Sequence, residues 1–253
     1  MHAHLFIPCL VEDCQPETAE AVVEVLERLG VEVRHPSGQT CCGQLAYKTG
    51  DVANARLLAR RYLDIFAAPG PVVCPSGSCV KMVRTYPELF AAGTEEHARA
   101  VELAARTFEF CEFVAAQTSQ AGQQELDKLG LHLKVRACYH GSCQMQGEGV
   151  AAPRRLLSAI RGLTLVEAER PERCCGFGGV FSLQFTSVSE ALVEDKCAEI
   201  LATKPEIIVS AEPSCLMNIS GHMARLGQRL PSLHVAQVLA AALKKETPAW
   251  RVK

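Results

Sequence analysis

The chain has 253 residues, of which 48% are hydrophobic and 21% charged, with a formal net charge of -2. This length suits two domains with two small cores, and the near-neutral charge excludes the basic surface that tight binding to nucleic acid requires. No stretch reaches the ~20 apolar residues that span a bilayer, so we expect no membrane span.

The first half of the sequence alternates short apolar runs with amphipathic segments. Strands are expected near residues 5–11, 31–34 and 71–74, the first of them followed by a loop. Helices are expected over residues 16–29, over residues 51–66 and after the turn at residues 75–79. Residues 108–116 read as a short strand and a helix that close this half.

The same plan restarts after a polar, glutamine-rich connector at residues 118–128. Strands are expected at residues 131–138, 163–166 and 207–209, and a closing strand and helix within 233–243. Helices are expected over residues 150–160 and in a segment that Ser187 and Glu190 would start as a capping box. The expected repeats are therefore residues 1–125 and 126–253.

Strands that alternate with helices predict an α/β fold with parallel sheets. In such sheets the functional loops gather at the carboxyl ends of the strands. We expect two pseudo-repeated, Rossmann-like units, each with its cysteine-bearing loops at that edge.

Cysteines carry most of the chemistry that the sequence offers. Thirteen of them, an odd number, in a chain whose N-terminus shows no secretory signal argue against a disulfide framework. They favour metal or redox chemistry in a reducing compartment, so we expect a cytoplasmic protein.

Adjacent pairs occur in Cys41-Cys42-Gly43 and Cys174-Cys175-Gly176. Because bridging two neighbouring cysteines distorts the peptide between them, each pair calls for an external atom to bind.

The cysteine that follows each pair is selected by comparing the two halves. Cys79 and Cys215 match, because each ends a turn after an equivalent apolar strand. Cys74 falls opposite Ser210 and ranks lower, since it has no partner. Cys197 lies on an apolar helix face, where a buried free thiol is the better interpretation.

The cysteine that precedes each pair stays ambiguous at this point. Cys9 with Cys138 and Cys14 with Cys143 match equally well by spacing; we select Cys9 and Cys143 and keep Cys14 and Cys138 in reserve. Four thiolates can hold a four-iron cluster, and the glycine after each pair leaves peptide N–H groups free to point at sulfide. The two candidate ligand sets are Cys9, Cys41, Cys42 and Cys79, and Cys143, Cys174, Cys175 and Cys215.

Other interpretations of these residues compete with a cluster. Four thiolates also suit a tetrahedral zinc ion, which would make the chain a structural subunit that assembles partners, although zinc sites usually draw ligands in closely spaced pairs. A thiol–disulfide switch would use Cys74 with Cys79, or Cys138 with Cys143, but C-x-x-C spacing is absent. His140 would donate to a cluster sulfur or serve as a ligand, whereas loop histidines of this kind are more often only hydrogen-bonded.

Four motifs resemble those of the cysteine-rich CCG-domain proteins: TCCGQ at residues 40–44, PSGSC at 75–79, CCGFGG at 174–179 and SCLMNISG at 214–221. This family includes a cysteine-rich component of heterodisulfide reductase and the iron-sulfur subunits of glycolate oxidase and glycerol-3-phosphate dehydrogenase. The resemblance covers nearly the whole chain and is strongest to its lactate-utilization members.

The resemblance implies an iron-sulfur electron-transfer subunit of a multi-protein oxidoreductase. That system would oxidise L-lactate to pyruvate, or a related 2-hydroxy acid such as glycolate, with other iron-sulfur or flavin subunits as partners. A heterodisulfide-reductase-like thiol/disulfide redox subunit is the alternative within the family.

One departure from the family motif bears on the cluster type. The motif ends each repeat with C-x-x-C, whereas Met82 and Asn218 occupy the last positions here. In the heterodisulfide reductases, five cysteines per repeat support a non-cubane double cluster. Because this chain offers four, a conventional [4Fe-4S] cluster, one or two per chain, is at least as well supported.

Overall fold

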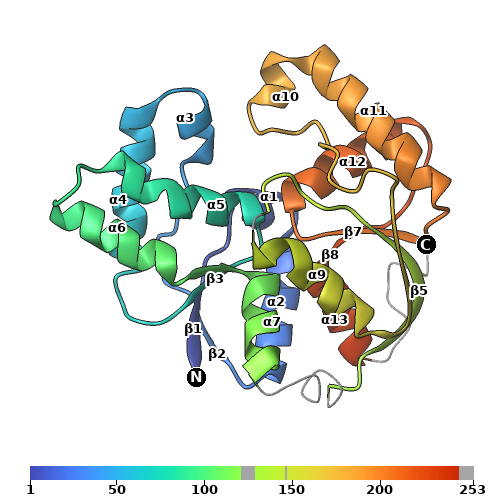
Figure 1. Ribbon diagram of the computed structural model, residues 1–253, viewed down its shortest axis with the longest axis horizontal. Helices are drawn as coiled ribbons and strands as arrows, with labels where there is room; N and C mark the ends of the chain where they lie inside the picture. The colour runs from blue at the N-terminus through green and yellow to red at the C-terminus, as the bar shows by residue number, and fades with distance from the viewer. Residues whose placement is uncertain (121–128, 146, 245–253) are drawn as a thin grey trace. The chain divides into compact units, whose positions relative to one another are not determined.

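The computed structural model describes residues 1–120, 129–145 and 147–244 (Figure 1). The chain divides into two compact units, Met1–Phe110, called unit 1 below, and Cys111–Lys253, called unit 2. The expected repeat boundary between residues 125 and 126, and most of the connector at 118–128, lie outside the described residues. Within the described ranges, no helix is long and apolar enough to cross a bilayer.

Unit 1 is built on a four-stranded, all-parallel sheet with the strand order β2-β1-β3-β4. The strands are β1 (His2–Leu5), β2 (Glu32–Arg34), β3 (Val72–Cys74) and β4 (Thr107–Glu109). The helices are α1 (Cys9–Cys14), α2 (Pro16–Arg28), α3 (Gln44–Lys48), α4 (Val52–Ile65), α5 (Gly77–Thr85) and α6 (Glu95–Ala105), with a 3-10 turn, η1 (Tyr86–Leu89). Because parallel neighbours need crossover connections, loops leave the carboxyl ends of these strands at one edge of the sheet.

Unit 2 repeats this plan with the order β6-β5-β7-β8, again all parallel. Its strands are β5 (His132–Tyr139), β6 (Arg161–Glu167), β7 (Ile207–Ser210) and β8 (Ser232–His234). Its helices are α9 (Glu148–Ser158), α10 (Phe181–Gln184), α11 (Thr186–Ala202), α12 (Pro213–Arg225) and α13 (Val235–Lys244), preceded by α7 (Phe110–Gln120) at the start of the unit. The prediction of two pseudo-repeated Rossmann-like α/β units is confirmed.

Each unit has a core of its own beneath the cysteine loops. In unit 1, the ring of Tyr62 packs edge-on against Phe6 and Tyr86, with centroids 4.9 Å and 5.5 Å apart. Cys42 belongs to this same buried cluster. In unit 2, helices α11 and α12 pack against each other (Figure 1), and their apolar faces form a buried cluster that includes Cys175 and Cys215. The second cysteine of each pair is therefore packed into the core of its unit.

The strand expected at residues 5–11 is wrong in extent. The strand ends at Leu5, and helix α1 begins at Cys9 with Pro8 as its N-cap residue. Proline has no amide hydrogen to continue the ladder of the sheet, and its fixed φ suits the start of a helix. The second part of the apolar run instead buries Val11 on the inner side of α1.

The capping box expected at Ser187 and Glu190 does not form. Helix α11 begins two residues earlier than such a box requires, at Thr186, and its N-cap residue Phe185 makes no side-chain capping bond. Because the carbonyl of Phe185 already accepts the amide of Ser189, Ser187 lies inside the first turn of the helix. The preceding helix α10 therefore leads the backbone into α11 without a polar cap.

Candidate metal centres

Each Cys-Cys-Gly motif forms the same tight turn. The φ angle is +85° at Gly43 and +83° at Gly176, a left-handed conformation that favours glycine. This turn aims the amide of Gly43 at the Sγ of Cys41, 3.4 Å away, and the amide of Gly176 at the Sγ of Cys174, 3.3 Å away. An N–H group directed at sulfur stabilises the thiolate, which is the form that binds metals.

A second loop of each unit places a cysteine in the first turn of a helix. Cys79 is the third residue of α5, and Cys215 is the third residue of α12. Both helices are capped by side chains: Ser76 accepts the amide of Cys79, and Glu212 accepts the amide of Ser214. The unpaired amides and partial positive charge of a helix N-terminus therefore lie beside both cysteines.

Cysteines from separate loops meet in unit 1. The thiol of Cys42 donates to the Sγ of Cys79 at 3.5 Å. Interaction with the side chains of Cys42 and Cys9 lowers the pKa of Cys41, and the same interactions raise the pKa of Cys42 and of Cys9. Hydrogen bonds from Cys42 and then Cys74 also lower the pKa of Cys79. The four sulfur atoms selected from the sequence therefore form one connected set, with Cys74 beside it.

In unit 2, three of the four selected cysteines are connected in the same way. Cys175 donates to the Sγ of Cys215 at 3.0 Å. A hydrogen bond from Cys174 lowers the pKa of Cys175, but the bond to Cys215 together with burial outweighs it, and the net shift is upward. The Sγ of Cys215 also lies 3.9 Å from the Oγ of Ser142, which precedes the exposed Cys143 in sequence.

Sulfur atoms gathered in this way fit a bound cation. All thirteen cysteines are free thiols, none of them paired in a disulfide. Neighbouring thiolates repel one another, so complete ionisation of either set requires positive charge among them. Thiolates are soft donors that select zinc, copper(I) and iron–sulfur clusters over magnesium or calcium.

The strand register shows which leading cysteines are equivalent. Leu5 pairs with Val73 of β3, and Tyr139 pairs with Val209 of β7. Each of those partners lies six residues before the cysteine of the following helix. Leu5 and Tyr139 therefore occupy equivalent places, and four residues after them come Cys9 and Cys143.

The cysteines held in reserve have other surroundings. Cys14 is exposed at the far end of α1, and Cys138 is buried within β5, where burial raises its pKa. Cys197 is buried on α11, as expected, and burial raises its pKa to about 11, so it is a neutral thiol. Cys74, which the sequence ranks low, instead forms a side-chain hydrogen bond with Cys79.

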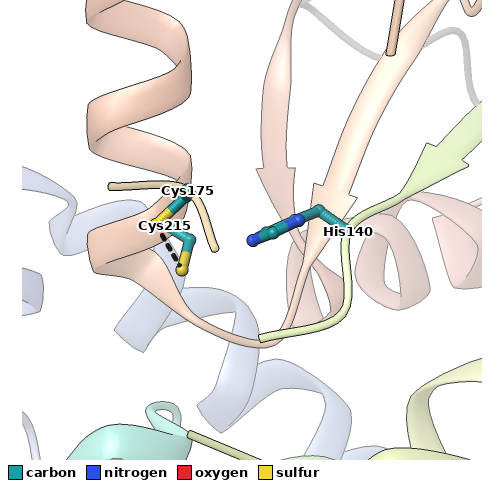
Figure 2. A group of neighbouring side chains, drawn as sticks. All are labelled: His140, Cys175 and Cys215. Atoms are coloured by element: carbon teal, nitrogen blue, oxygen red, sulfur yellow. Dashed lines mark hydrogen bonds between the residues drawn. The ribbon is translucent and has the colours of Figure 1, made fainter. Parts of the chain in front are cut away.

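His140 lies beside the sulfur atoms of unit 2. The side chain is 1% exposed, and a ring nitrogen and the Sγ atoms of Cys175 and Cys215 all lie within 4.8 Å of one another (Figure 2). Neither ring nitrogen has a hydrogen-bond partner among the described residues, a situation that costs about 1–3 kcal/mol. Burial, assisted by the positive charge of Lys196, lowers the pKa of His140 to about 3, so the ring is neutral.

A side chain following each cysteine-bearing helical turn holds the carbonyl of the paired cysteines. The hydroxyl of Tyr86 donates to the carbonyl oxygen of Cys42 at 2.8 Å, and the amide of Asn218 donates to that of Cys175 at 2.7 Å. These bonds fix the two cysteine loops against their neighbouring helices. The sequence carries no signal for either bond, because nothing in a local pattern links a helix residue to a distant carbonyl.

The loop ahead of Cys174 is fastened by Lys196, which is fully buried. Its Nζ atom donates to the carbonyl oxygens of Arg170 and Pro171 at 2.7 Å and 3.1 Å, and Glu199 lies 4.0 Å away. A buried ammonium group at this position also offsets negative charge on nearby thiolates.

Comparison with protein families agrees with this description. The family model described as the cysteine-rich domain, CCG, matches residues 3–84 and 137–220. The chain therefore belongs to the cysteine-rich CCG-domain family, with one copy of the domain in each half.

Curated relatives match along nearly their whole length. Lactate utilization protein A of Geobacillus kaustophilus is 40% identical over 95% of this chain and 99% of its own. Lactate utilization protein A 2 of Bacillus cereus (strain Q1) is 38% identical over 97% of this chain and 100% of its own. Among solved structures, an aspartate racemase homologue from Pyrococcus horikoshii covers 96% of this chain and 97% of its own at 11% identity, with a TM-score of 0.33, too low to indicate a shared fold.

Proposed function

We propose that the chain is an iron-sulfur subunit of a multi-protein system that oxidises L-lactate to pyruvate, with one [4Fe-4S] cluster in each unit. The observation that carries this proposal is the connected set of cysteine thiols at equivalent loops of both units. The relatives named lactate utilization protein A support the substrate, with glycolate and other small 2-hydroxy acids as the neighbouring class. Such a cluster, when bound, accepts and returns one electron at a time.

The residues of the chain would hold and tune this group. The selected ligands are Cys9, Cys41, Cys42 and Cys79 in unit 1, and Cys143, Cys174, Cys175 and Cys215 in unit 2. The amides that follow each cysteine pair lie against sulfur, and hydrogen bonds of this kind raise the reduction potential of a cluster. Partner subunits with further clusters or a flavin would supply and remove the electrons. With every cysteine a free thiol, the reducing cytoplasm is the compartment we propose.

Metal and sulfide analysis of protein purified without oxygen tests the proposal. We expect about eight irons and a matching amount of acid-labile sulfide per chain, together with an electron paramagnetic resonance (EPR) signal after reduction. Iron without sulfide, or neither of them, would contradict it.

A structural zinc site is the second candidate, because in each unit two sulfur atoms lie close enough together to share a single metal ion. Around one tetrahedral zinc ion, with Zn–S bonds of about 2.3 Å, thiolates lie about 3.8 Å apart. The Cys42–Cys79 and Cys175–Cys215 pairs are 3.5 Å and 3.0 Å apart. Zinc without sulfide in the same analysis, with unfolding on chelation, would establish this scaffold role instead.

Two variants test the leading ligand of unit 1. We expect Cys9→Ser to lower the iron and sulfide content, because the thiol of Cys9 contacts Cys41. Cys14→Ser is the matched control on the same short helix, and its exposed thiol should be dispensable. The measurement is iron per chain; loss on changing Cys14 with retention on changing Cys9 would reverse the assignment.

A further inference from the structure

In unit 2 a histidine ring lies beside the candidate ligands, at a place that a phenylalanine ring occupies in unit 1. We propose that a ring nitrogen of His140 binds an iron atom of the unit 2 centre in place of the exposed Cys143, beside the sulfur atoms of Cys175 and Cys215. This inference rests on the proposed function, because it presupposes a cluster at these cysteines.

The backbone places His140 where unit 1 has Phe6. The amide of Phe6 donates to the carbonyl of Val73 at 2.9 Å, and the amide of His140 donates to that of Val209 at 2.8 Å. The two residues therefore leave equivalent strands at the same point. Phe6 is fully buried and packs edge-on against Tyr62, so an aromatic ring without polar atoms fills this place in unit 1.

Packing alone does not explain why both ring nitrogens of His140 are buried without a hydrogen-bond partner among the described residues. The ring is buried, and among the described residues neither nitrogen finds a hydrogen-bond partner. Figure 2 shows the ring extending from the loop after β5 toward the sulfur atoms of Cys175 and Cys215. Buried polar atoms in native proteins nearly always have a partner, and the donor atoms of His140, Cys175 and Cys215 lie close enough together that they would hold one metal atom.

A histidine ligand would make the two centres electronically different. Imidazole binds as a neutral ligand, whereas a cysteine binds as an anion, and replacing thiolate by imidazole raises the reduction potential of an iron–sulfur centre. The unit 2 centre is then the more easily reduced of the two. This difference between the two centres arises because His140 follows β5 at the place where Phe6 follows β1.

Pulsed EPR of the reduced, anaerobically purified chain tests the coordination directly. A directly bound imidazole gives a nitrogen hyperfine coupling several-fold larger than that of a hydrogen-bonded amide, and the coupling changes when histidine is labelled with ¹⁵N. We expect this coupling in the native chain and its loss in His140→Phe, which copies unit 1. His132→Gln is the control, because His132 is exposed at the start of β5, the strand that His140 follows, and its loss should change nothing.

A second variant separates ligation from a structural role. His140→Cys should keep the iron and sulfide of the native chain but shift the reduction potential of one centre to a more negative value, because a thiolate then replaces the imidazole. A residue that only filled space would leave the potential unchanged.

The outcomes distinguish the inference from the proposed function. Iron and sulfide with no large nitrogen coupling in the native chain would overturn the role of His140 and leave the cluster assignment intact. Absence of iron and sulfide would overturn both. If His140→Phe does not fold, the labelled native chain alone still decides whether a histidine nitrogen is bound.

Discussion

Substitution of Cys175 by Ser is expected to remove about half of the iron and acid-labile sulfide of the chain, because only the unit 2 centre loses a ligand. Cys175 is 3% exposed and its thiol links Cys174 to Cys215, so its loss breaks the sulfur set at the middle. A serine hydroxyl is a harder donor than a thiolate and a poor substitute at iron. Iron and sulfide per chain, measured without oxygen, give the result.

Two further variants provide a counterpart in unit 1 and a control for that measurement. Cys42→Ser should remove the other half of the iron, because Cys42 holds the equivalent place in unit 1. Cys197→Ser is the control: its thiol is equally buried in the same apolar cluster as Cys175 and is not a candidate ligand. Full iron and sulfide in both Cys175→Ser and Cys42→Ser would exclude the cluster assignment.

The glycines of the two Cys-Cys-Gly turns are expected to differ sharply in their tolerance of a side chain. Alanine at either position has to adopt a left-handed conformation, at about 1–2 kcal/mol. At Gly176, however, a Cβ atom would stand 2.5 Å from the carbonyl oxygen of Ser189 in α11 and 3.2 Å from the Cβ of Leu192. Pushing the backbone of α11 away adds roughly 1–3 kcal/mol. We therefore expect Gly176→Ala to be the more destabilising change by that further amount.

Gly43→Ala is the matched control for that change. The nearest atoms to a Cβ at Gly43 are the Cβ of Leu58 at 3.4 Å and the carbonyl oxygen of Ala55 at 3.5 Å, which are ordinary contacts. Urea unfolding of the metal-free, reduced variants measures both effects without the contribution of a bound group. Equal losses of stability in the two variants would show that conformation at glycine, and not the approach of α11, sets the cost.

The order of strands and helices could be predicted because the sequence repeats it. Apolar runs bounded by Pro and Gly gave β3 and β7, and amphipathic spacing gave α2 and α4, each confirmed to within a few residues. Helix α6 had no predicted counterpart, although Thr94 before two glutamates is a start signal, and its side chain does accept the amide of His97. The amphipathic spacing of residues 95–105 is also comparable to that of α4, so the sequence carries a signal for α6 beyond its polar cap.

The composition of the two centres could be predicted only in part. The pairs and the cysteines after them follow from local motifs, and these thiols lie together in each unit. The equivalence of Cys9 and Cys143 needs the strand register, because spacing along the chain matches Cys138 to Cys9 equally well. The contrast between Phe6 and His140 depends on the same register. Contacts that depend on strand register cannot be predicted from the sequence until the pairing of the strands is known.

The carbonyls of Cys42 and Cys175 are hydrogen-bonded by side chains at different places in the two halves. Asn218 lies three residues after Cys215, whereas Tyr86 lies seven residues after Cys79, about one helical turn further along. The two units therefore share this bond, although the residue that makes it and the place of that residue along the chain differ. A comparison of the halves that looks only for identical residues would miss the equivalence. What the two units have in common at this point is a carbonyl that is hydrogen-bonded, and two different side chains supply the donor.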